Sequence, residues 1–483
     1  MLAPTWYTNA NIIMKNSFTY LSQTYVIFAI VAIFFGLIFV KITPPLWGAD
    51  EGQHFFRAYQ LSKGEFVQPQ VTFEGKTLSG GRVPGSFRLL DKLREKDITD
   101  AIPGESKQVD GRDLYDQAAH ISVTKDTLTA NPYGKNIYSP LVYGAPALGV
   151  AIGRAFSDMP LSLLASARIA TLFLYVSLVS FALFLLRRTF VRWLVFVIAL
   201  LPMSIYQASV VSPDSLLLGL SLIFFAAVYS VIHVGRKLDK KTIGLLALSA
   251  GLLTLVKMPY VILVLLLTIL PLPKHLGKRQ RMILKVAVPM IALLVALFSL
   301  MSIRGVAGTP LTNISISVPG QLHWVLGHPL SYIYVLMNSV SVLDWVPQAI
   351  GLFGSSFIFI PGFIFQILLI GISLMAFMNT KQDIDDSRKS NTRTAVVYLL
   401  ICLLLVIGIA STLYLTWTPV GANLIQGVQG RYFLPIVVFV LMGMRMLTRA
   451  RLMVSQRSIM IGSTLLSSTT LLVSILWYYR ILY

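Results

Sequence analysis

The sequence predicts an all-α integral membrane protein, a polytopic bundle of about 11 to 13 transmembrane helices with a large first extracytoplasmic loop. Three observations predict this fold. Of the 483 residues, 55% are hydrophobic and only 12% are charged, and the mean hydropathy is +0.73. Long apolar segments recur along most of the chain. Short loops rich in lysine and arginine separate many of these segments. Soluble domains carry about 25% charged residues, so a soluble class is excluded.

The formal net charge is +20. In a soluble protein this would indicate a nucleic-acid partner. Here the basic residues lie between apolar segments, so orientation in a lipid bilayer explains them and we expect no nucleic acid. The single cysteine, Cys402, lies inside an apolar run, which excludes a disulfide within the chain and a metal-thiolate cluster.

Four regions follow from the pattern of polar and apolar residues. Residues 1–24 are predicted to be a cytoplasmic N-terminus, and 25–43 a first transmembrane anchor that stays uncleaved because no small-residue cleavage site follows it. Residues 44–138 form a predicted extracytoplasmic loop subdomain, rich in Gly and Pro, and this region holds 13 of the 20 acidic residues. The remaining residues, 139–483, form the predicted transmembrane bundle.

Further spans are predicted near 161–186, 193–212, 213–234, 242–257, 259–272, 283–302, 357–378, 394–415, 431–447 and 458–479. Two more apolar stretches, 139–156 and 329–346, are rich in Pro, Gly and Tyr. They could be re-entrant or interfacial helices rather than full spans. Whether they cross decides between about 11 and about 13 spans.

The basic residues of the short loops favour the smaller number. They include Arg187, Arg188, Arg192, Arg236, Lys237, Lys240, Lys241, Lys274, Lys278, Arg279, Arg281, Lys381, Arg388, Lys389, Arg393, Arg445, Arg449, Arg451 and Arg457. If neither ambiguous stretch crosses, all of these loops face the cytoplasm, as the positive-inside rule expects. The N-terminus is then inside and the C-terminus outside. The alternative of 13 spans keeps the same termini but puts Arg187 and Arg188 outside.

An acidic pair, Asp50 and Glu51, follows the first anchor directly. On a helix starting near Ala49, Asp50 shares a face with His54, and Arg57 follows one turn later. Such a face could bind a phosphate or a divalent cation, Mg²⁺ or Mn²⁺. It could also hold a general base for a hydroxyl. The alternative is a solvated loop start with His54 as an ordinary helix-surface residue.

Three more charged residues are predicted on the same outer side. Asp214 lies two residues into a span, where it also suits the positive end of the helix dipole. Lys257 ends a span and could simply snorkel to the interface. Arg431 follows a polar, glycine-containing segment, and its guanidinium could fork a phosphate or anchor the span at the interface. An active site would therefore be extracytoplasmic, beneath the first loop.

Other chemistries have no support in the sequence. There is no Walker loop, no dinucleotide fingerprint and no Gly-x-Ser-x-Gly elbow. A single histidine near Glu51 does not make a zinc-protease motif. A transferase on the outer face has no access to cytosolic nucleotide sugars, so its donor would have to be carried across the membrane by a lipid.

Five short motifs, in this order, give the chain a recognisable pattern. They are Pro-x-x-x-x-Asp-Glu-x-x-His-x-x-Arg-Ala (45–58), Tyr-Ser-Pro-Leu (138–141), Ser-x-Asp (212–214), Lys-x-Pro-Tyr (257–260) and Gln-Gly-Arg-Tyr-Phe-Leu-Pro (429–435). Together they resemble a bacterial membrane family, the domain-of-unknown-function family 2142, over about residues 44–435. That family in turn is similar to the GT-C superfamily of polytopic glycosyltransferases, which use polyprenyl-phosphate-linked sugars.

The resemblance implies a GT-C-like fold and an inverting transfer of sugar from a polyprenyl-phosphate donor to a glycan acceptor. Asp50 or Glu51 would match the first-loop acid that acts as base or binds metal, and Asp214 would match a second outer acid. Arg431 and Lys257 would stabilise the phosphate leaving group. From their place on the same helix face as Asp50, His54 and Arg57 are further predicted substrate-binding residues.

Two other functions stay open at this stage. One is a polysaccharide or lipid-linked-glycan transporter or flippase, and the other is a non-catalytic component of envelope polysaccharide assembly. A transporter predicts polar and charged residues along several spans and often an internal repeat. The sequence has few such residues, gathered at one face, and shows no internal repeat.

Overall fold

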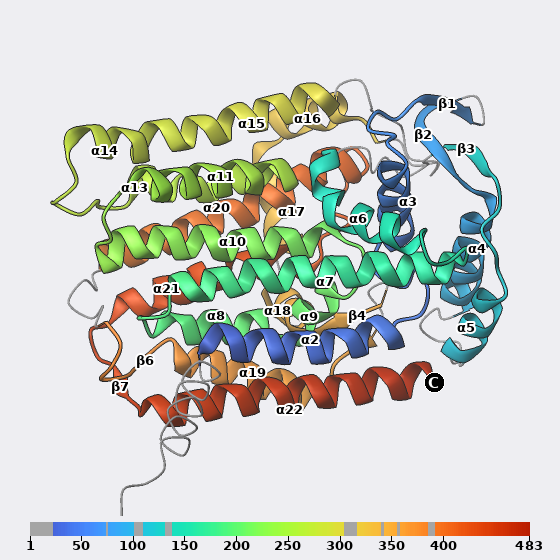
Figure 1. Cartoon of the computed structure of the whole chain (residues 1–483). Helices are drawn as coiled ribbons and strands as arrows, with labels where there is room; N and C mark the ends of the chain where they lie inside the picture. Colours follow the sequence, from blue (N-terminus) through green and yellow to red (C-terminus); the bar gives the residue numbers. More distant parts are fainter. Residues whose placement is uncertain are drawn as a thin grey trace, which may run out of the picture.

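The computed structural model is a bundle of helices that run side by side, with a smaller subdomain at one end (Figure 1). It describes residues 23–73, 76–100, 110–130, 138–303, 316–339, 342–354, 358–384 and 392–483. The helices of the bundle are α2 (Thr24–Ile42), α6 (Gly144–Gly153), α7 (Pro160–Leu185), α8 (Val191–Ala199), α9 (Pro202–Ala208), α10 (Pro213–Tyr229), α11 (Lys240–Val256), α12 (Val261–Val264), α13 (Leu266–Ile269), α14 (Lys278–Met282), α15 (Val288–Ile303), α16 (Val318–Gly327), α17 (Pro329–Ser339), α18 (Val342–Gly351), α19 (Gly362–Met375), α20 (Thr392–Trp417), α21 (Val437–Leu447) and α22 (Gln456–Leu482).

The prediction of an all-α polytopic membrane protein is confirmed. In the described part of the chain, seven helices are long and apolar enough to cross a membrane, or eight if the bent pair α8 and α9 is one span. The seven are Thr24–Ile42, Pro160–Leu185, Pro213–Val234, Lys278–Met301, Thr392–Trp417, Gly430–Leu447 and Gln456–Leu482. Each overlaps a span that the sequence predicts.

Three other predicted spans correspond to shorter helices. The segment 242–257 forms α11, which has 17 residues, and 357–378 contains α19, which has 14. The segment 259–272 forms the short pieces α12 and α13. Fourteen residues rise only about 21 Å along a helix, less than the roughly 30 Å of a hydrocarbon core. Within the described residues, fewer helices therefore have full spanning length than the 11 or so spans expected from the sequence.

The two ambiguous stretches also form short helices. The first is a 3-10 turn followed by α6, together Pro140–Gly153, and the second is divided between α17 and α18. These lengths agree with the interpretation that neither stretch crosses fully.

Close packing fixes α6 against α7. Gly149 and Gly153 are one turn apart on α6, as in the Gly-x-x-x-Gly pattern of closely packed membrane helices. A Cβ atom at Gly149 would lie 2.4 Å from the backbone oxygen of Ser166 on α7. The helix α7 also packs against α10, which is buried along almost its whole length. The bundle is therefore built around α7 and α10.

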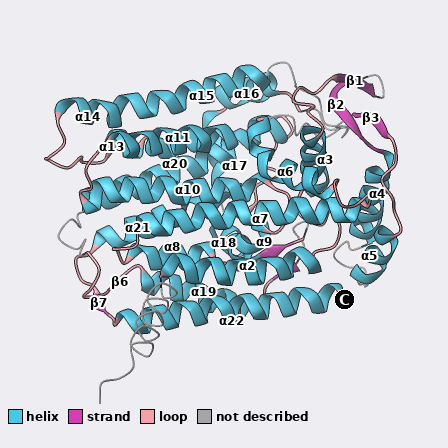
Figure 2. Cartoon of the chain, viewed as in Figure 1, coloured by secondary structure: helices cyan, strands magenta, loops and turns pink. Residues whose placement is uncertain are grey.

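The segment between α2 and α6 forms the subdomain. It contains α3 (Glu51–Ser62), β1 (Gln70–Phe73), β2 (Lys76–Pro84), α4 (Gly85–Asp100), α5 (Gly111–Ala119) and β3 (Asp126–Ala130). The three strands form an antiparallel sheet in the order β1-β2-β3, with Val83 opposite Thr127. Figure 2 shows this sheet at the end of the bundle, beside α3 and α4. Within the described residues, the other strands are two-residue pairs: β4 (Leu352–Phe353), β5 (Ile358–Phe359), β6 (Met378–Asn379) and β7 (Leu452–Met453).

The two ends of the bundle differ in charge. The helix α14 and the strands β6 and β7, which lie beside basic loops, gather at the end opposite the subdomain (Figure 1). At that end Arg192 forms a buried ion pair with Asp383 and also bonds Thr24, the first residue of α2. At the other end the hydroxyl of Tyr483 donates to the carbonyl oxygen of Ile42 at 3.1 Å. The start of α2 therefore lies with the basic loops, and the C-terminus lies with the acidic subdomain.

Candidate functional site

Asp50 lies at the start of α3, at the junction between the anchor and the subdomain. Its backbone is left-handed, with φ 59° and ψ 14°, a conformation that Asp tolerates better than most residues. Its side chain is 38% exposed, and Oδ2 lies 3.8 Å from Nη2 of Arg431. Asp50 is thus a carboxylate that reaches solvent while facing a buried cation.

Asp214 is the second carboxylate of the site. The Ser212 hydroxyl accepts a hydrogen bond from the Asp214 N–H and caps α10, and Pro213 occupies its first turn. The Asp214 side chain is nearly buried, and its Oδ1 lies 2.5 Å from Nζ of Lys257. The break after α11 positions Lys257, because Pro259 starts a new 3-10 turn there.

Arg431 connects the two carboxylates. Its guanidinium lies between Asp50 and Asp214, with Nε 3.3 Å from Oδ2 of Asp214, and its side chain is 6% exposed. The preceding residue is Gly430, where a Cβ atom would lie 2.3 Å from the backbone oxygen of Trp345 on α18. Only glycine permits this approach, which holds Arg431 at the start of the 3-10 helix Gly430–Ile436. The four charged side chains are two anions and two cations, so the cluster is neutral at rest.

Tyr432 supports the cationic pair. Nζ of Lys257 lies 4.1 Å from the centroid of the Tyr432 ring, and the Arg431 guanidinium carbon lies 5.4 Å from it. The hydroxyl of Tyr260 donates to the Tyr432 carbonyl oxygen at 2.5 Å. Both cations are therefore held by a ring face as well as by carboxylates.

His54 and two tyrosines border the cluster on the subdomain side. Nδ1 of His54 lies 2.8 Å from the hydroxyl of Tyr143, and the ring of Tyr138 packs edge-on against both. Burial raises the pKa of Tyr138, and the negative charge of Asp214 adds to the effect. Its phenol therefore stays protonated at neutral pH, as a neutral hydrogen-bond donor.

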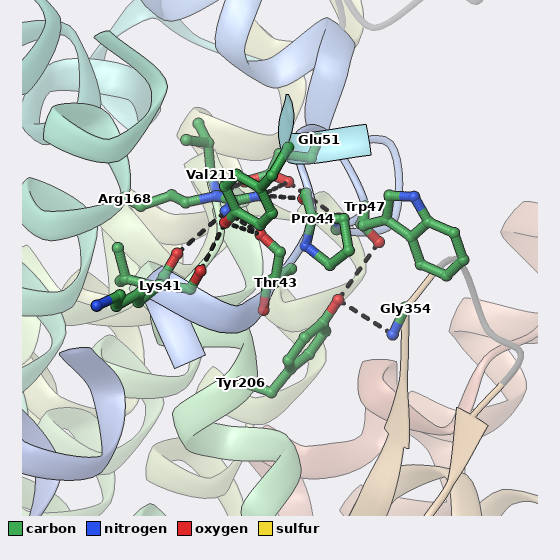
Figure 3. A network of polar contacts seen from close by, with 12 residues as sticks. Lys41, Thr43, Pro44, Trp47, Glu51, Arg168, Tyr206, Val211 and Gly354 are labelled. Carbon is green, nitrogen blue, oxygen red and sulfur yellow. Dashed lines mark hydrogen bonds and ion pairs between the residues drawn. The ribbon is translucent and has the colours of Figure 1, made fainter. Parts of the chain in front are cut away.

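Glu51 has a different role from its neighbour. Its side chain is fully buried and forms a bidentate ion pair with Arg168, 2.7 Å at each oxygen. The backbone N–H groups of Gly48 and Val211 donate to the same two oxygens. Figure 3 shows this network, in which Arg168 also bonds the backbone of the loop after α2. These four donors occupy both oxygens of Glu51, so the geometry favours Asp50 over Glu51 as the candidate base. A catalytic role for either residue stays a prediction.

Arg57 also lies outside the cluster. It is buried, and it donates to the carbonyl oxygens of Glu65 and Phe66 and to the side chain of Gln60. At nearly two turns along α3, the Arg57 side chain thus holds the segment that follows this helix. A contact between Arg57 and a substrate stays a prediction.

All five sequence motifs contribute a side chain to this one place, from Asp50 in the first to Arg431 in the last. A family model described as a predicted membrane protein, DUF2142, matches residues 33–440, which include every residue of the cluster. The chain belongs to the DUF2142 family. This confirms the resemblance read from the motifs at the level of that family, while the further similarity to GT-C enzymes stays a prediction. No curated protein and no solved structure matches the chain.

The motifs of this DUF2142 protein did not predict two features of the site: the ion pair of Glu51 with Arg168, and the contacts of Tyr138 and Tyr143 with His54. Arg168 lies inside the apolar segment 161–186, and a charged residue within a span needs a partner of opposite charge. This position of Arg168 is a sequence signal that could have predicted its ion pair with Glu51. Tyr138 and Tyr143 lie at the start of an apolar stretch, where aromatic residues commonly mark the membrane interface. Their contact with His54 depends on the fold of α3 onto α6, for which the sequence carries no signal.

The carboxylates of this DUF2142 protein do not fit a divalent cation. Mg²⁺ and Mn²⁺ prefer several oxygen ligands, and both oxygens of Asp214 already face cations, Lys257 and Arg431. Over the residues that the structure describes, no group of three His, Cys, Asp or Glu side chains could hold a metal ion. The two side-chain cations occupy the positions where a metal would balance these carboxylates.

Proposed function

We propose that the chain is a membrane glycosyltransferase. It moves a sugar from a polyprenyl-phosphate donor to a hydroxyl of a surface polysaccharide or lipid-linked glycan. The observation that carries this proposal is the partly exposed Asp50 carboxylate beside the buried cation of Arg431, which shares its other carboxylate partner, Asp214, with Lys257. A sugar transfer from a lipid phosphate needs these two elements: a base for the acceptor and positive charge for the leaving phosphate.

The reaction is a single displacement. Asp50 takes the proton of the acceptor hydroxyl as that oxygen forms a bond to the anomeric carbon. The bond from this carbon to the phosphate oxygen breaks, and its electron pair stays on the phosphate. Arg431 and Lys257 stabilise the added negative charge, and Asp214 holds both cations in place. Attack opposite the leaving group inverts the anomeric configuration.

The proposed location is the outer face of the cell membrane, with the N-terminus in the cytoplasm. The basic loops and the start of α2 share one end of the bundle, and the cluster lies toward the other, next to the subdomain (Figure 1). The positive-inside rule assigns the basic end to the cytoplasm. At the outer face a lipid-linked donor is the sugar source within reach.

The test compares surface glycans from four strains at equal membrane abundance of the protein: wild type, deletion, and the deletion complemented with Asp50→Asn or with Asp113→Asn. Asp113 is an exposed residue of α5 in the same subdomain and serves as the matched control. We expect the deletion and the Asp50→Asn strain to lack the same sugar, because loss of a general base costs about 10²-fold to 10⁴-fold in rate. Asp113→Asn should restore it. A glycan fully restored by Asp50→Asn would contradict the mechanism.

A further inference from the structure

The contact between Asp50 and Arg431 is too short for the proposed transfer. In a single displacement, the acceptor oxygen, the anomeric carbon and the phosphate oxygen lie in line between the base and the cation. Inverting glycosidases, which also use one displacement, keep their two flanking carboxyl groups about 6.5 to 9.5 Å apart to leave room for the incoming oxygen. The Asp50 Oδ2 and Arg431 Nη2 atoms are only 3.8 Å apart. One of the two side chains must therefore move before the reaction.

Arg431 is the side chain that is held in place. It is 6% exposed, its Nε lies 3.3 Å from Oδ2 of Asp214, and its guanidinium carbon lies over the ring of Tyr432. The close approach of Gly430 to the backbone of α18 fixes the start of the 3-10 helix that carries it. Moving this cation would break a buried ion pair, which is costly.

Asp50 is the side chain that can turn away. It is 38% exposed, so its carboxylate can exchange the contact with Arg431 for water at little cost. Its side chain does not cap α3, and its left-handed backbone, with φ 59°, places it outside that helix. Because Asp50 is the partly exposed partner of a buried cation, its position is also the side on which the cluster meets solvent.

The charges of the cluster fit one phosphate in place of Asp50. With Asp50 in contact, two carboxylates balance the cations of Lys257 and Arg431. When Asp50 turns to solvent, only Asp214 remains against the two cations, which leaves one net positive charge. A sugar joined to a lipid through a phosphodiester carries one negative charge and restores neutrality. If Asp50 stayed, two anions would crowd the same face of one guanidinium, and like charges side by side are costly.

We propose that the Asp50 carboxylate occupies the binding position of the donor phosphate on Arg431, and that the donor displaces it, an inference that rests on the proposed function. The displaced carboxylate turns toward the acceptor hydroxyl, at the distance that an inverting transfer needs. Asp50 therefore becomes available as the base only after the phosphate has taken its place. The donor binds first and the acceptor second.

The experiment measures dissociation constants of the purified protein in lipid nanodiscs. The probes are polyprenyl phosphate and, as its uncharged counterpart, polyprenol. A ligand that must displace an internal group binds more weakly in proportion to the fraction of protein that is open. Asp50→Asn and Asp50→Gly should therefore each bind polyprenyl phosphate about tenfold more tightly than wild type, with unchanged affinity for polyprenol. Glycine adopts the left-handed backbone of this position without strain, so the second variant removes the carboxylate and keeps the fold.

Two control variants separate displacement from a general change of charge. Asp50→Glu keeps a carboxylate at this position and should not gain affinity for polyprenyl phosphate. Asp113→Asn removes an exposed carboxylate of the same subdomain, away from the cluster, and should bind as wild type does.

The outcomes distinguish this inference from the proposed function. If Asp50→Asn and Asp50→Gly bind polyprenyl phosphate no more tightly than wild type, Asp50 does not occupy the phosphate position, and the inference is overturned while the phosphate site stands. An equal gain in Asp50→Glu or Asp113→Asn would overturn it in the same way. If neither wild type nor the Asp50 variants prefer polyprenyl phosphate to polyprenol, the proposed function fails and the inference with it.

Discussion

At the residue scale, two adjacent carboxylates differ because of their backbone and their neighbours. Asp50 is left-handed and its side chain turns toward Arg431 and solvent, whereas Glu51 begins α3 and its side chain turns inward to Arg168. A buried ion pair of this kind is stable only while both partners are present and their remaining hydrogen bonds are made. Glu51 therefore secures the loop on which Asp50 is presented.

Removing the Glu51 charge should destabilise the whole protein. Glu51→Gln leaves the guanidinium of Arg168 buried without its counter-charge, which costs about 3 to 5 kcal/mol. We expect a clear fall in the thermal unfolding temperature of the detergent-solubilised protein. Asp116→Asn, at an exposed position of α5, is the control and should leave that temperature unchanged. An unfolding temperature of Glu51→Gln equal to wild type would show that the pair contributes no stability.

The cationic pair should make the transfer independent of metal. Both oxygens of Asp214 lie against Lys257 and Arg431, so a divalent cation would have to displace one of them. We expect the transfer rate of purified protein to stay within about twofold after treatment with EDTA. Recovery of a lost rate on adding Mg²⁺ or Mn²⁺ would mean that the cluster rearranges to bind metal.

Two substitutions of Arg431 should show whether its positive charge alone is enough for sugar transfer or whether the shape of the guanidinium is also needed. Arg431→Lys keeps one positive charge but cannot contact Asp50 and Asp214 together in the planar fork of a guanidinium. We expect a loss in rate of about 10²-fold in Arg431→Lys and a larger loss in Arg431→Met, measured as sugar transfer by purified protein. Equal rates in wild type and Arg431→Lys would argue against a bridging role for the guanidinium.

At the element scale, helix ends and helix breaks bring the site together. Asp214 starts α10, Lys257 follows the end of α11, and Arg431 begins the 3-10 helix that leads into α21. Each is a position where the backbone leaves one helix for another, which lets a charged side chain reach the membrane surface while its helix stays apolar. The packing of α6 on α7 adds the aromatic border around His54.

The contact between α6 and α7 can be tested with two glycines of one helix. Gly149→Ala places a methyl group 2.4 Å from the backbone oxygen of Ser166, so the two helices must separate, at a cost of about 1 to 3 kcal/mol. Gly144→Ala meets no atom within 4 Å and should be neutral or slightly stabilising. Thermal unfolding in detergent measures both. An equal effect of the two substitutions would mean that α6 is not held closely against α7.

At the scale of the whole molecule, charge divides the bundle into two ends. The described basic loops lie together with the start of α2, and the acidic subdomain lies with the C-terminus (Figure 1). The positive-inside rule predicts that the end with the basic loops faces the cytoplasm. The proposed orientation puts the site on the side of the membrane that faces away from the cytoplasm.

Cysteine labelling of intact cells tests this orientation. The native Cys402 is 3% exposed, so the reagent should not label it. A membrane-impermeant maleimide should label Lys125→Cys, an exposed position of the subdomain, in intact cells. It should label Lys237→Cys, an exposed position in a basic loop, only after the cells are opened. The reverse pattern would invert the proposed topology and move the site to the cytoplasm.

The sequence by itself determined the membrane class, the position of most long spans and the family, and it singled out Asp50, Asp214, Lys257 and Arg431 as candidate site residues. It could do so because apolar length and short motifs are local properties of the chain. Only the tertiary structure decided that Glu51 pairs with Arg168, that Arg57 holds the segment after α3, and that the guanidinium of Arg431 contacts both carboxylates of the site. These are contacts between residues far apart in the chain, and local patterns carry no information about which distant partner satisfies a buried polar group.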